Sequence, residues 1–112
     1  MARVLAPRLA PLALALLLGG CGGPAPAPRP HVYRVTIANM AFGPSPTGLQ
    51  AGDSIEWVND DIFQHSATAR NGAFDVDLPP KAHATTVLKT PGRLAFYCKY
   101  HPGMAGTLVV AS

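Results

Sequence analysis

The sequence predicts an all-β domain, an antiparallel β-sandwich, and three observations favour this fold class. Apolar and polar residues alternate in several short stretches, turn-forming residues separate these stretches, and no stretch of the 112 residues has a convincing helical period. A chain of this length allows one domain. Trp57, the single tryptophan, is expected to pack between the two sheets.

Three of the predicted strands show the alternation clearly. Their apolar positions are Tyr33, Val35 and Ile37 in the first, Ile55 and Trp57 in the second, and Leu94, Phe96 and Cys98 in the third. Glycine and proline then mark turns between the strands, as in GPSPTG at 43–48, RNG at 70–72 and TPGR at 90–93. Short strands at this spacing indicate a sandwich more than any helical fold.

Residues 1–20 have the features of a signal peptide. Arg3 and Arg8 precede an apolar run, 9–18, which is shorter than the roughly 20 residues that span a bilayer. The ending LGGC at 18–21 resembles a bacterial lipobox, so Cys21 is expected to become the acylated first residue. The alternative is an ordinary secretory signal that is cut elsewhere. We expect an exported lipoprotein, anchored to a membrane and facing the periplasm or the cell exterior.

Residues 21–30 form the predicted tether, and residues 31–112 the folded domain. The stretch GGPAPAPRP at 22–30 favours extended polyproline II structure and cannot build a core. An exported protein with two cysteines would by default pair them, but a disulfide between Cys21 and Cys98 would tie a strand end to this loose tail. We therefore expect the two cysteines to have separate roles.

Charge and motif content exclude several functions. Beyond the signal peptide, seven basic residues nearly balance six acidic ones and form no basic run, which argues against nucleic-acid binding. Asp60 and Asp61 are adjacent in a predicted turn, where carboxylates usually cap or face solvent, and no nucleophile accompanies them. The chain is therefore not expected to be an enzyme.

Potential metal ligands cluster near the C-terminus. Cys98, His101 and Met104 lie at intervals of three residues on a predicted loop between two strands, and His65, after an earlier strand, is the obvious fourth ligand. Taken singly, each has an ordinary alternative as a buried thiol, a core methionine or a surface histidine. Together, a thiolate, two imidazoles and a weak thioether favour one copper ion, since zinc seldom binds methionine.

The remaining histidines and one methionine have no such partners. His31 and His83 are expected to be solvated, and Met40 is left between a core position and the metal-binding end.

Several motifs carry a resemblance to a known family. They are FGP at 42–44, AGDSIEWVNDD at 51–61, His65, TPG at 90–92 and FYCKYHPGMAGTLVV at 96–110. On these residues the chain resembles the cupredoxins, the small blue copper proteins of the plastocyanin and amicyanin type, and its ligand loop is similar in spacing to that of the amicyanins. The resemblance implies a Greek-key β-sandwich of about eight strands and one type 1 copper. It also implies His65, Cys98 and His101 as equatorial ligands and Met104 as the axial one.

Two positions near the ligands depart from the family pattern. Ser66 follows the first histidine, where many relatives have an asparagine that holds the ligand loop. Tyr100 stands where the amicyanin loop has proline, so its backbone N–H is available to the Cys98 sulfur.

Four side chains fill copper's useful positions, which favours outer-sphere electron transfer over catalysis. We expect a monomeric, membrane-tethered electron carrier that docks transiently with a redox protein through Pro102, Gly103 and Ala105 around His101. Two alternatives stay open, a copper scavenger or delivery protein and a copper subunit of a larger oxidoreductase.

Overall fold

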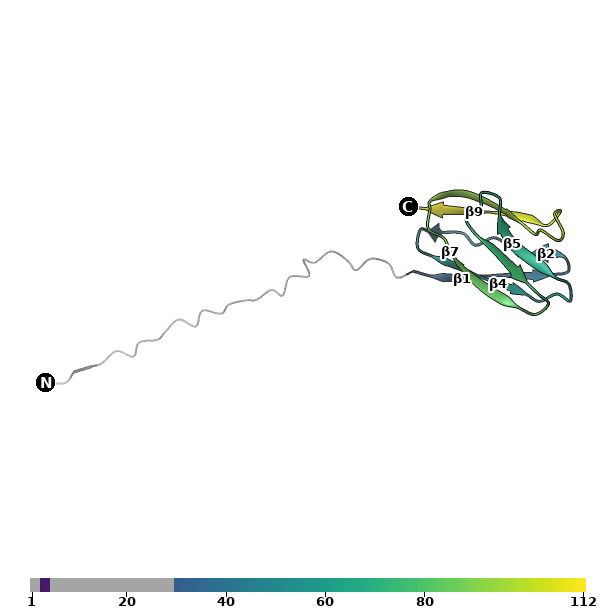
Figure 1. The fold of residues 1–112 in the computed structure, drawn as a ribbon. Helices are drawn as coiled ribbons and strands as arrows, with labels where there is room; N and C mark the ends of the chain where they lie inside the picture. Colours follow the sequence, from purple (N-terminus) through teal and green to yellow (C-terminus); the bar gives the residue numbers. More distant parts are fainter. Residues whose placement is uncertain (1–2, 5–29) are drawn as a thin grey trace.

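Two β-sheets packed face to face make up the folded domain (Figure 1). The computed structural model describes residues 3–4 and 30–112, so the predicted lipidation site and most of the predicted signal peptide and tether lie outside the described residues. The strands are β1 (Val32–Ala38), β2 (Ala41–Phe42), β3 (Leu49–Gln50), β4 (Ser54–Asn59), β5 (His65–Ala69), β6 (Asp75–Leu78), β7 (His83–Val87), β8 (Gly92–Tyr97) and β9 (Ala105–Ala111). The predicted β-sandwich is confirmed, with nine strands where about eight were expected.

The strand order mixes antiparallel and parallel pairs. One sheet has the order β2-β1-β4-β7 and the other β3-β9-β8-β5-β6. The expectation of a purely antiparallel sandwich is wrong for β1 with β4 and for β3 with β9, which are parallel. The chain between β1 and β4 passes through β3 in the opposite sheet instead of a tight hairpin. Because the chain crosses over in this way, β4 runs in the same direction as β1.

The core lies between the sheets around Trp57, as predicted, with none of its surface exposed. Phe42, Phe74 and Phe96 surround the indole, with ring centroids 6.0, 5.6 and 5.0 Å from it. The indole N–H donates to Thr86 Oγ1 at 3.0 Å, so its polar atom is satisfied inside the core. This aromatic cluster gives the sandwich a rigid centre.

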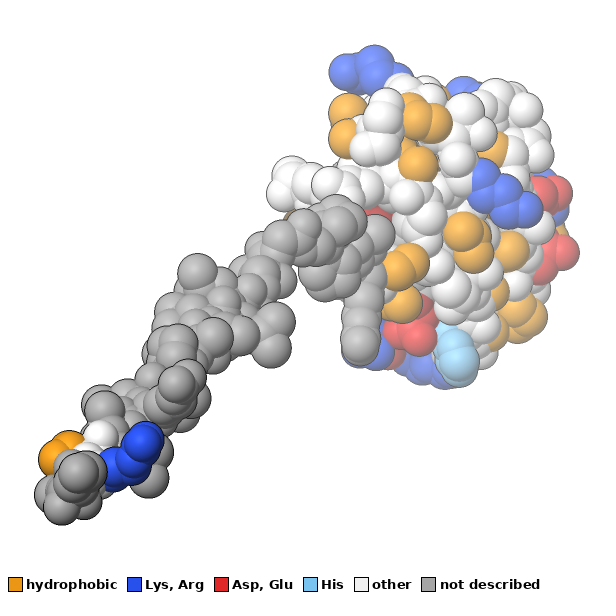
Figure 2. Space-filling view, turned by 90° about the vertical axis from the view of Figure 1, so that its left-hand side faces the viewer, with side chains coloured by type: hydrophobic (Ala, Val, Ile, Leu, Met, Phe, Trp, Pro, Cys, Tyr) orange, Lys and Arg blue, Asp and Glu red, His pale blue; other side chains and the backbone are white. Residues whose placement is uncertain are grey.

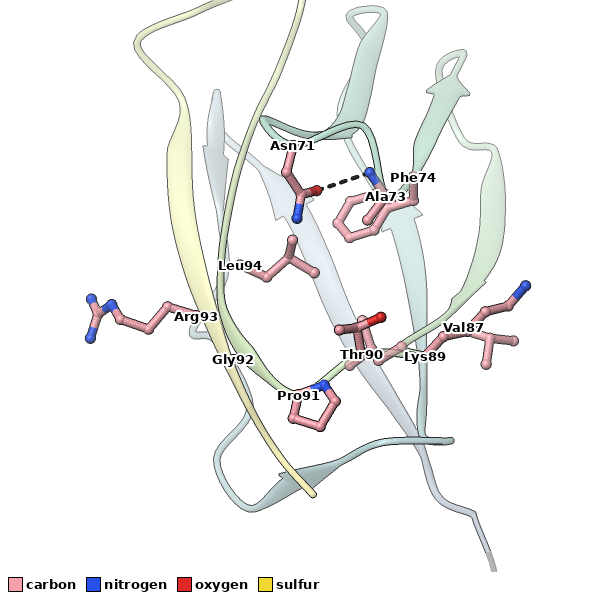
Figure 3. Close-up of a pocket in the computed structure, with 11 residues that line it drawn as sticks. Asn71, Ala73, Phe74, Val87, Lys89, Thr90, Pro91, Gly92, Arg93 and Leu94 are labelled. Carbon is pink, nitrogen blue, oxygen red and sulfur yellow. Dashed lines mark hydrogen bonds between the residues drawn. The ribbon is translucent and has the colours of Figure 1, made fainter.

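The two ends of the sandwich have different characters. β1 starts where the domain begins, and its far end meets the loop before β5, where the Met40 N–H donates to Asp61 Oδ2 at 2.9 Å. At the end where the domain begins, a cavity of about 330 Å³ is lined by Phe74, Leu88 and Leu94 among others (Figure 3). None of the four predicted metal ligands lines this cavity. No helix in the described ranges, 3–4 and 30–112, is long and apolar enough to cross a membrane.

Candidate metal centre

His65 and Cys98 meet at the end of the sandwich away from the start of the domain. His65 is the first residue of β5, and Cys98 directly follows β8, the antiparallel neighbour of β5. His65 Nδ1 lies 3.7 Å from Cys98 Sγ, and neither residue is exposed. The sheet therefore brings together an imidazole and a free thiol from positions 33 residues apart.

The loop from Cys98 to Met104 supplies the other two predicted ligands. The Cys98 N–H donates to the Met104 carbonyl at 3.0 Å, and the Met104 N–H donates to the His101 carbonyl at 2.8 Å. These two bonds close the loop tightly, so that Met104 is only 7% exposed and the His101 ring centroid is 5.0 Å from that of His65. All four predicted ligands therefore lie at one end of the domain.

Asp61 makes a contact that the sequence did not reveal. Its Oδ2 lies 3.1 Å from His65 Nε2, on the side of the ring away from the thiol, and also accepts the Met40 N–H. The Met40 N–H and then the His65 ring lower the pKa of the Asp61 carboxyl. Asp60, by contrast, is exposed and contacts Lys81, as expected for a turn carboxylate. In the sequence, the signal for the contact between Asp61 and His65 was their separation of four residues.

Asn59 holds the loop that carries Asp61 and His65. Its buried side-chain amide donates to the carbonyls of Phe63 and Leu78, both at 2.8 Å, while its Oδ1 accepts the Asp61 N–H at 2.9 Å. These bonds from one buried side chain hold the loop against the sheet, and the loop in turn orients the His65 ring.

Ser66 reaches the ligand loop with both its backbone and its side chain. Its N–H points at Cys98 Sγ at 3.3 Å, and its Oγ accepts the Lys99 N–H at 2.9 Å. The serine thus holds the start of the ligand loop, which the sequence had left open. Tyr100 was the expected N–H donor to the sulfur. Within residues 30–112 the recorded N–H donor is Ser66, and Tyr100 instead donates its hydroxyl to Asp77 at 2.9 Å.

The residues expected at the docking surface are exposed around a half-buried His101. Pro102, Gly103 and Ala105 all face solvent. The structure adds two large apolar side chains from the neighbouring loop, Ile62 at 73% exposure and Phe63 at 47%. The rings of Phe63 and His101 are 6.4 Å apart. We call Ile62, Phe63, Pro102, Gly103 and Ala105 the contact face.

The other histidines and Met40 take no part in this cluster. His31 and His83 are exposed, as expected. Met40, unassigned from the sequence, is 38% exposed and lies by its backbone next to Asp61, so it belongs to the metal-binding end and not to the core.

The donor set fits one copper ion. A thiol, two imidazoles and a thioether are soft or borderline donors, which suit copper better than zinc or a hard cation. No three His, Cys, Asp or Glu side chains of the described ranges already meet in the arrangement of a metal cage. We therefore assign His101 and Met104 to the donor set because the closed loop places them at the same end of the domain as His65 and Cys98. The assignment does not rest on distances between donor atoms.

Comparisons with known proteins agree with this fold. Residues 10–110 match the family described as the cupredoxin-like domain. The chain is 26% identical to plastocyanin from Nostoc punctiforme over an alignment of 125 positions, which covers 91% of this chain and 90% of that protein. It shares its fold with amicyanin from Paracoccus versutus, with a TM-score of 0.63, 20% identity and coverage of 70% of this chain and 80% of that one. An amicyanin variant in its reduced Cu(I) form gives a TM-score of 0.62 at 21% identity, over 70% of this chain and 81% of that one.

Fold and site together define a small β-sandwich protein with a buried thiol and imidazole at one end. The chain belongs to the cupredoxin-like domain family, which matches it over residues 10–110.

Proposed function

We propose that this protein binds one type 1 copper ion and carries single electrons between redox partners by outer-sphere transfer. His65, Cys98 and His101 are the proposed equatorial ligands and Met104 the proposed axial ligand. The observation that carries the proposal is the buried pair of His65 Nδ1 and Cys98 Sγ, 3.7 Å apart and beside the loop that ends in Met104. A thiol and an imidazole in this position form the strong part of a blue-copper donor set.

Copper, when bound, supplies a one-electron couple between its cupric and cuprous states. The protein contributes a fixed geometry for that couple. The Ser66 N–H and the backbone bond from Cys98 to Met104 hold the sulfur, and the Asp61 carboxylate orients the His65 ring. With four side chains as ligands and both His65 and Cys98 buried, no open position is left for a substrate. This closed arrangement supports electron transfer and argues against catalysis.

The contact face supports a role for His101 as the route by which electrons enter or leave. His101 is half-buried within that face, and Ile62 and Phe63 extend the apolar surface around it. A small apolar surface suits a brief encounter with another redox protein, because such complexes bury little area and separate quickly. We expect the natural partner to dock here, with the protein acting as a monomer.

The position of the first strand indicates which end of the domain a membrane tether would leave from. β1 begins at the end of the sandwich opposite the predicted metal centre, and that end faces the viewer in Figure 2, with apolar side chains and charged side chains of both signs spread over it. A chain exported by residues 1–20 and acylated at Cys21 would therefore present the contact face away from the membrane. We propose this orientation, with the domain in the periplasm or at the cell exterior.

The visible absorption spectrum of the full-length, copper-loaded protein tests the function. We expect an intense band that makes the oxidised protein blue, disappears on reduction with ascorbate and returns on reoxidation, and is lost in Cys98→Ser. A colourless protein that prefers zinc, or that binds copper only in the reduced state, would contradict electron transfer. Ready loss of the copper to a mild chelator would instead favour copper storage or delivery.

A further inference from the structure

A closed ring of hydrogen bonds lies beside the ligand loop. The Lys99 N–H donates to Ser66 Oγ, the Ser66 and Thr68 hydroxyls lie within hydrogen-bond distance, and Thr68 Oγ1 donates to Asp75 Oδ1, each at 2.9 Å. Lys99 Nζ then closes the ring at Asp75 Oδ1, also at 2.9 Å. We call the part formed by Ser66, Thr68 and Asp75 the relay. It connects the residue that follows Cys98 to a carboxylate on β6.

The carboxylate determines the direction of every bond in the relay. Lys99 and then the Thr68 hydroxyl lower the pKa of the Asp75 carboxyl, so this group is ionised and accepts only. The Thr68 hydroxyl must therefore donate its hydrogen bond to Asp75, and its oxygen is left to accept a hydrogen bond from the Ser66 hydroxyl. Ser66 Oγ is then left with its lone pairs for the Lys99 N–H. Without the carboxylate, the hydrogen bonds between the hydroxyls could point in either direction. With it, only one direction is possible.

Burial makes the relay sensitive to the loss of any member. Ser66 is fully buried and Thr68 is 7% exposed, so neither hydroxyl can replace a lost partner with bulk water. Within the described ranges, no buried side-chain nitrogen or oxygen lacks a hydrogen-bond partner. Each hydroxyl has two partners in the ring, which fixes its rotamer.

Ser66 connects the relay to the predicted metal ligand Cys98. Its N–H is the donor to Cys98 Sγ at 3.3 Å, while its Oγ holds the backbone of the next residue, Lys99. One residue therefore contacts the thiol with its backbone and holds the chain that leads away from it with its side chain. A rotation of the Ser66 side chain would release the Lys99 N–H and allow Cys98 to move.

We propose that Thr68 and Asp75 are positioning residues of the metal centre, which act through Ser66 to hold the Cys98 sulfur in place. The spectroscopic effect of this positioning rests on the proposed copper function, but the hydrogen bonds of the relay are present without metal.

Asp77 provides a matched control. It lies on β6 beside Asp75, is exposed to nearly the same extent, 54% against 52%, and also pairs with Lys99 Nζ, at 3.1 Å. It accepts the Tyr100 hydroxyl at 2.9 Å, whereas the Thr68 hydroxyl donates to Asp75. Removing Asp75 or Asp77 changes the charge near Cys98 in the same way, but only the loss of Asp75 breaks the relay.

The test compares Asp75→Ala, Thr68→Val and Asp77→Ala in the full-length protein. In the copper-free protein, amide exchange of Lys99 should rise by roughly three- to tenfold in the first two variants and stay near wild type in Asp77→Ala. In the copper-loaded protein, the same two variants should change the relative intensities of the sulfur-to-copper absorption bands, because these depend on the sulfur position. Asp75→Asn, which loses the charge but keeps an acceptor oxygen, should keep the wild-type spectrum.

Three outcomes would overturn the proposal. Unchanged Lys99 exchange in Thr68→Val would show that the relay does not hold the loop. Equal spectral changes in Asp75→Ala and Asp77→Ala would assign the effect to charge alone. A spectrum that is unchanged in Thr68→Val would show that the relay does not position the sulfur. If the wild type has no blue band but Lys99 exchange responds as expected, the copper function fails while the relay still holds the loop.

Discussion

Asp61 Oδ2 lies 3.1 Å from Nε2 of His65, while Nδ1 of the same ring lies 3.7 Å from the Cys98 sulfur. An ionised carboxylate can only accept a hydrogen bond, here from Nε2–H, so the tautomer with Nδ1 free is the favoured one. That nitrogen is then available as a metal ligand. Carboxylate partners of this kind fix ring orientation and raise the basicity of the ligand.

We therefore expect Asp61→Ala to weaken copper binding by about 10–100-fold, as losing such an outer partner usually does. A competition titration with a copper chelator measures the change. Asp60→Ala is the control, because the neighbouring carboxylate contacts the exposed Lys81 instead of the ligand. Equal affinities for the two variants would mean that Asp61 does not orient His65.

Gly106 marks a close approach between β9 and the aromatic core. A Cβ at this position would overlap the Phe96 ring, which also packs against Trp57 with centroids 5.0 Å apart. Gly106→Ala should therefore lower the free energy of unfolding by about 1–3 kcal/mol, as overpacking does. Denaturant unfolding of the copper-free protein measures it. Gly103→Ala, where no atom lies within 4 Å, should change stability little.

The Asp53 carboxylate links stability to pH. It is 4% exposed, and the N–H groups of His31 and Gln50, at 2.9 and 2.8 Å, hold its pKa below the ordinary value. Because the unfolded chain binds this proton more readily, the contribution is present above the unfolded pKa of about 3.9 and is lost as pH falls through the lowered folded pKa.

Asp53→Asn should therefore be less stable than wild type at neutral pH, and the difference should shrink in acid. Denaturation at several pH values between neutrality and about pH 2.5 measures this. A difference that stays constant over that range would show that the Asp53 carboxylate does not contribute through its charge.

The contact face can be tested without knowing the natural partner. Electron self-exchange between two copies of the protein should use the same surface, so Ile62→Glu, which places like charges opposite each other, should slow it by about tenfold or more. NMR line broadening in mixtures of oxidised and reduced protein measures the rate. Val109→Glu, at a position 57% exposed on β9, is the control. An equal loss of rate in both variants would argue against docking at this face.

Part of the fold was predictable because strands leave a period-two pattern. Val35, Ile37, Ile55 and Trp57 alternate with more exposed neighbours, and all four are buried as that pattern predicts. The parallel pairing of β1 with β4 was not predictable, because the alternation is the same in either direction. The path of the connection decides it, and that path is a property of the whole domain.

For the candidate site, spacing in the chain determined which residues were considered. The intervals from Cys98 to Met104 and the strand before His65 name four possible ligands by sequence alone, since ligands on one short loop must lie close together in any fold. Ser66 was visible as a departure from the family pattern, but whether its short side chain reached the loop was open. The structure answers this with the bond from the Lys99 N–H at 2.9 Å.

The sequence by itself determined the fold class, the donor types and the loop that carries three of them, because these depend on local order along the chain. Only the tertiary structure decided what surrounds the donors. Asp61 behind His65, and Asp75 at the end of a hydroxyl relay to Lys99, act across strands and loops. Hydrogen bonds require contact within about 3 Å, and such contacts between distant segments come from the packing of the sheets, which no periodicity in the chain records.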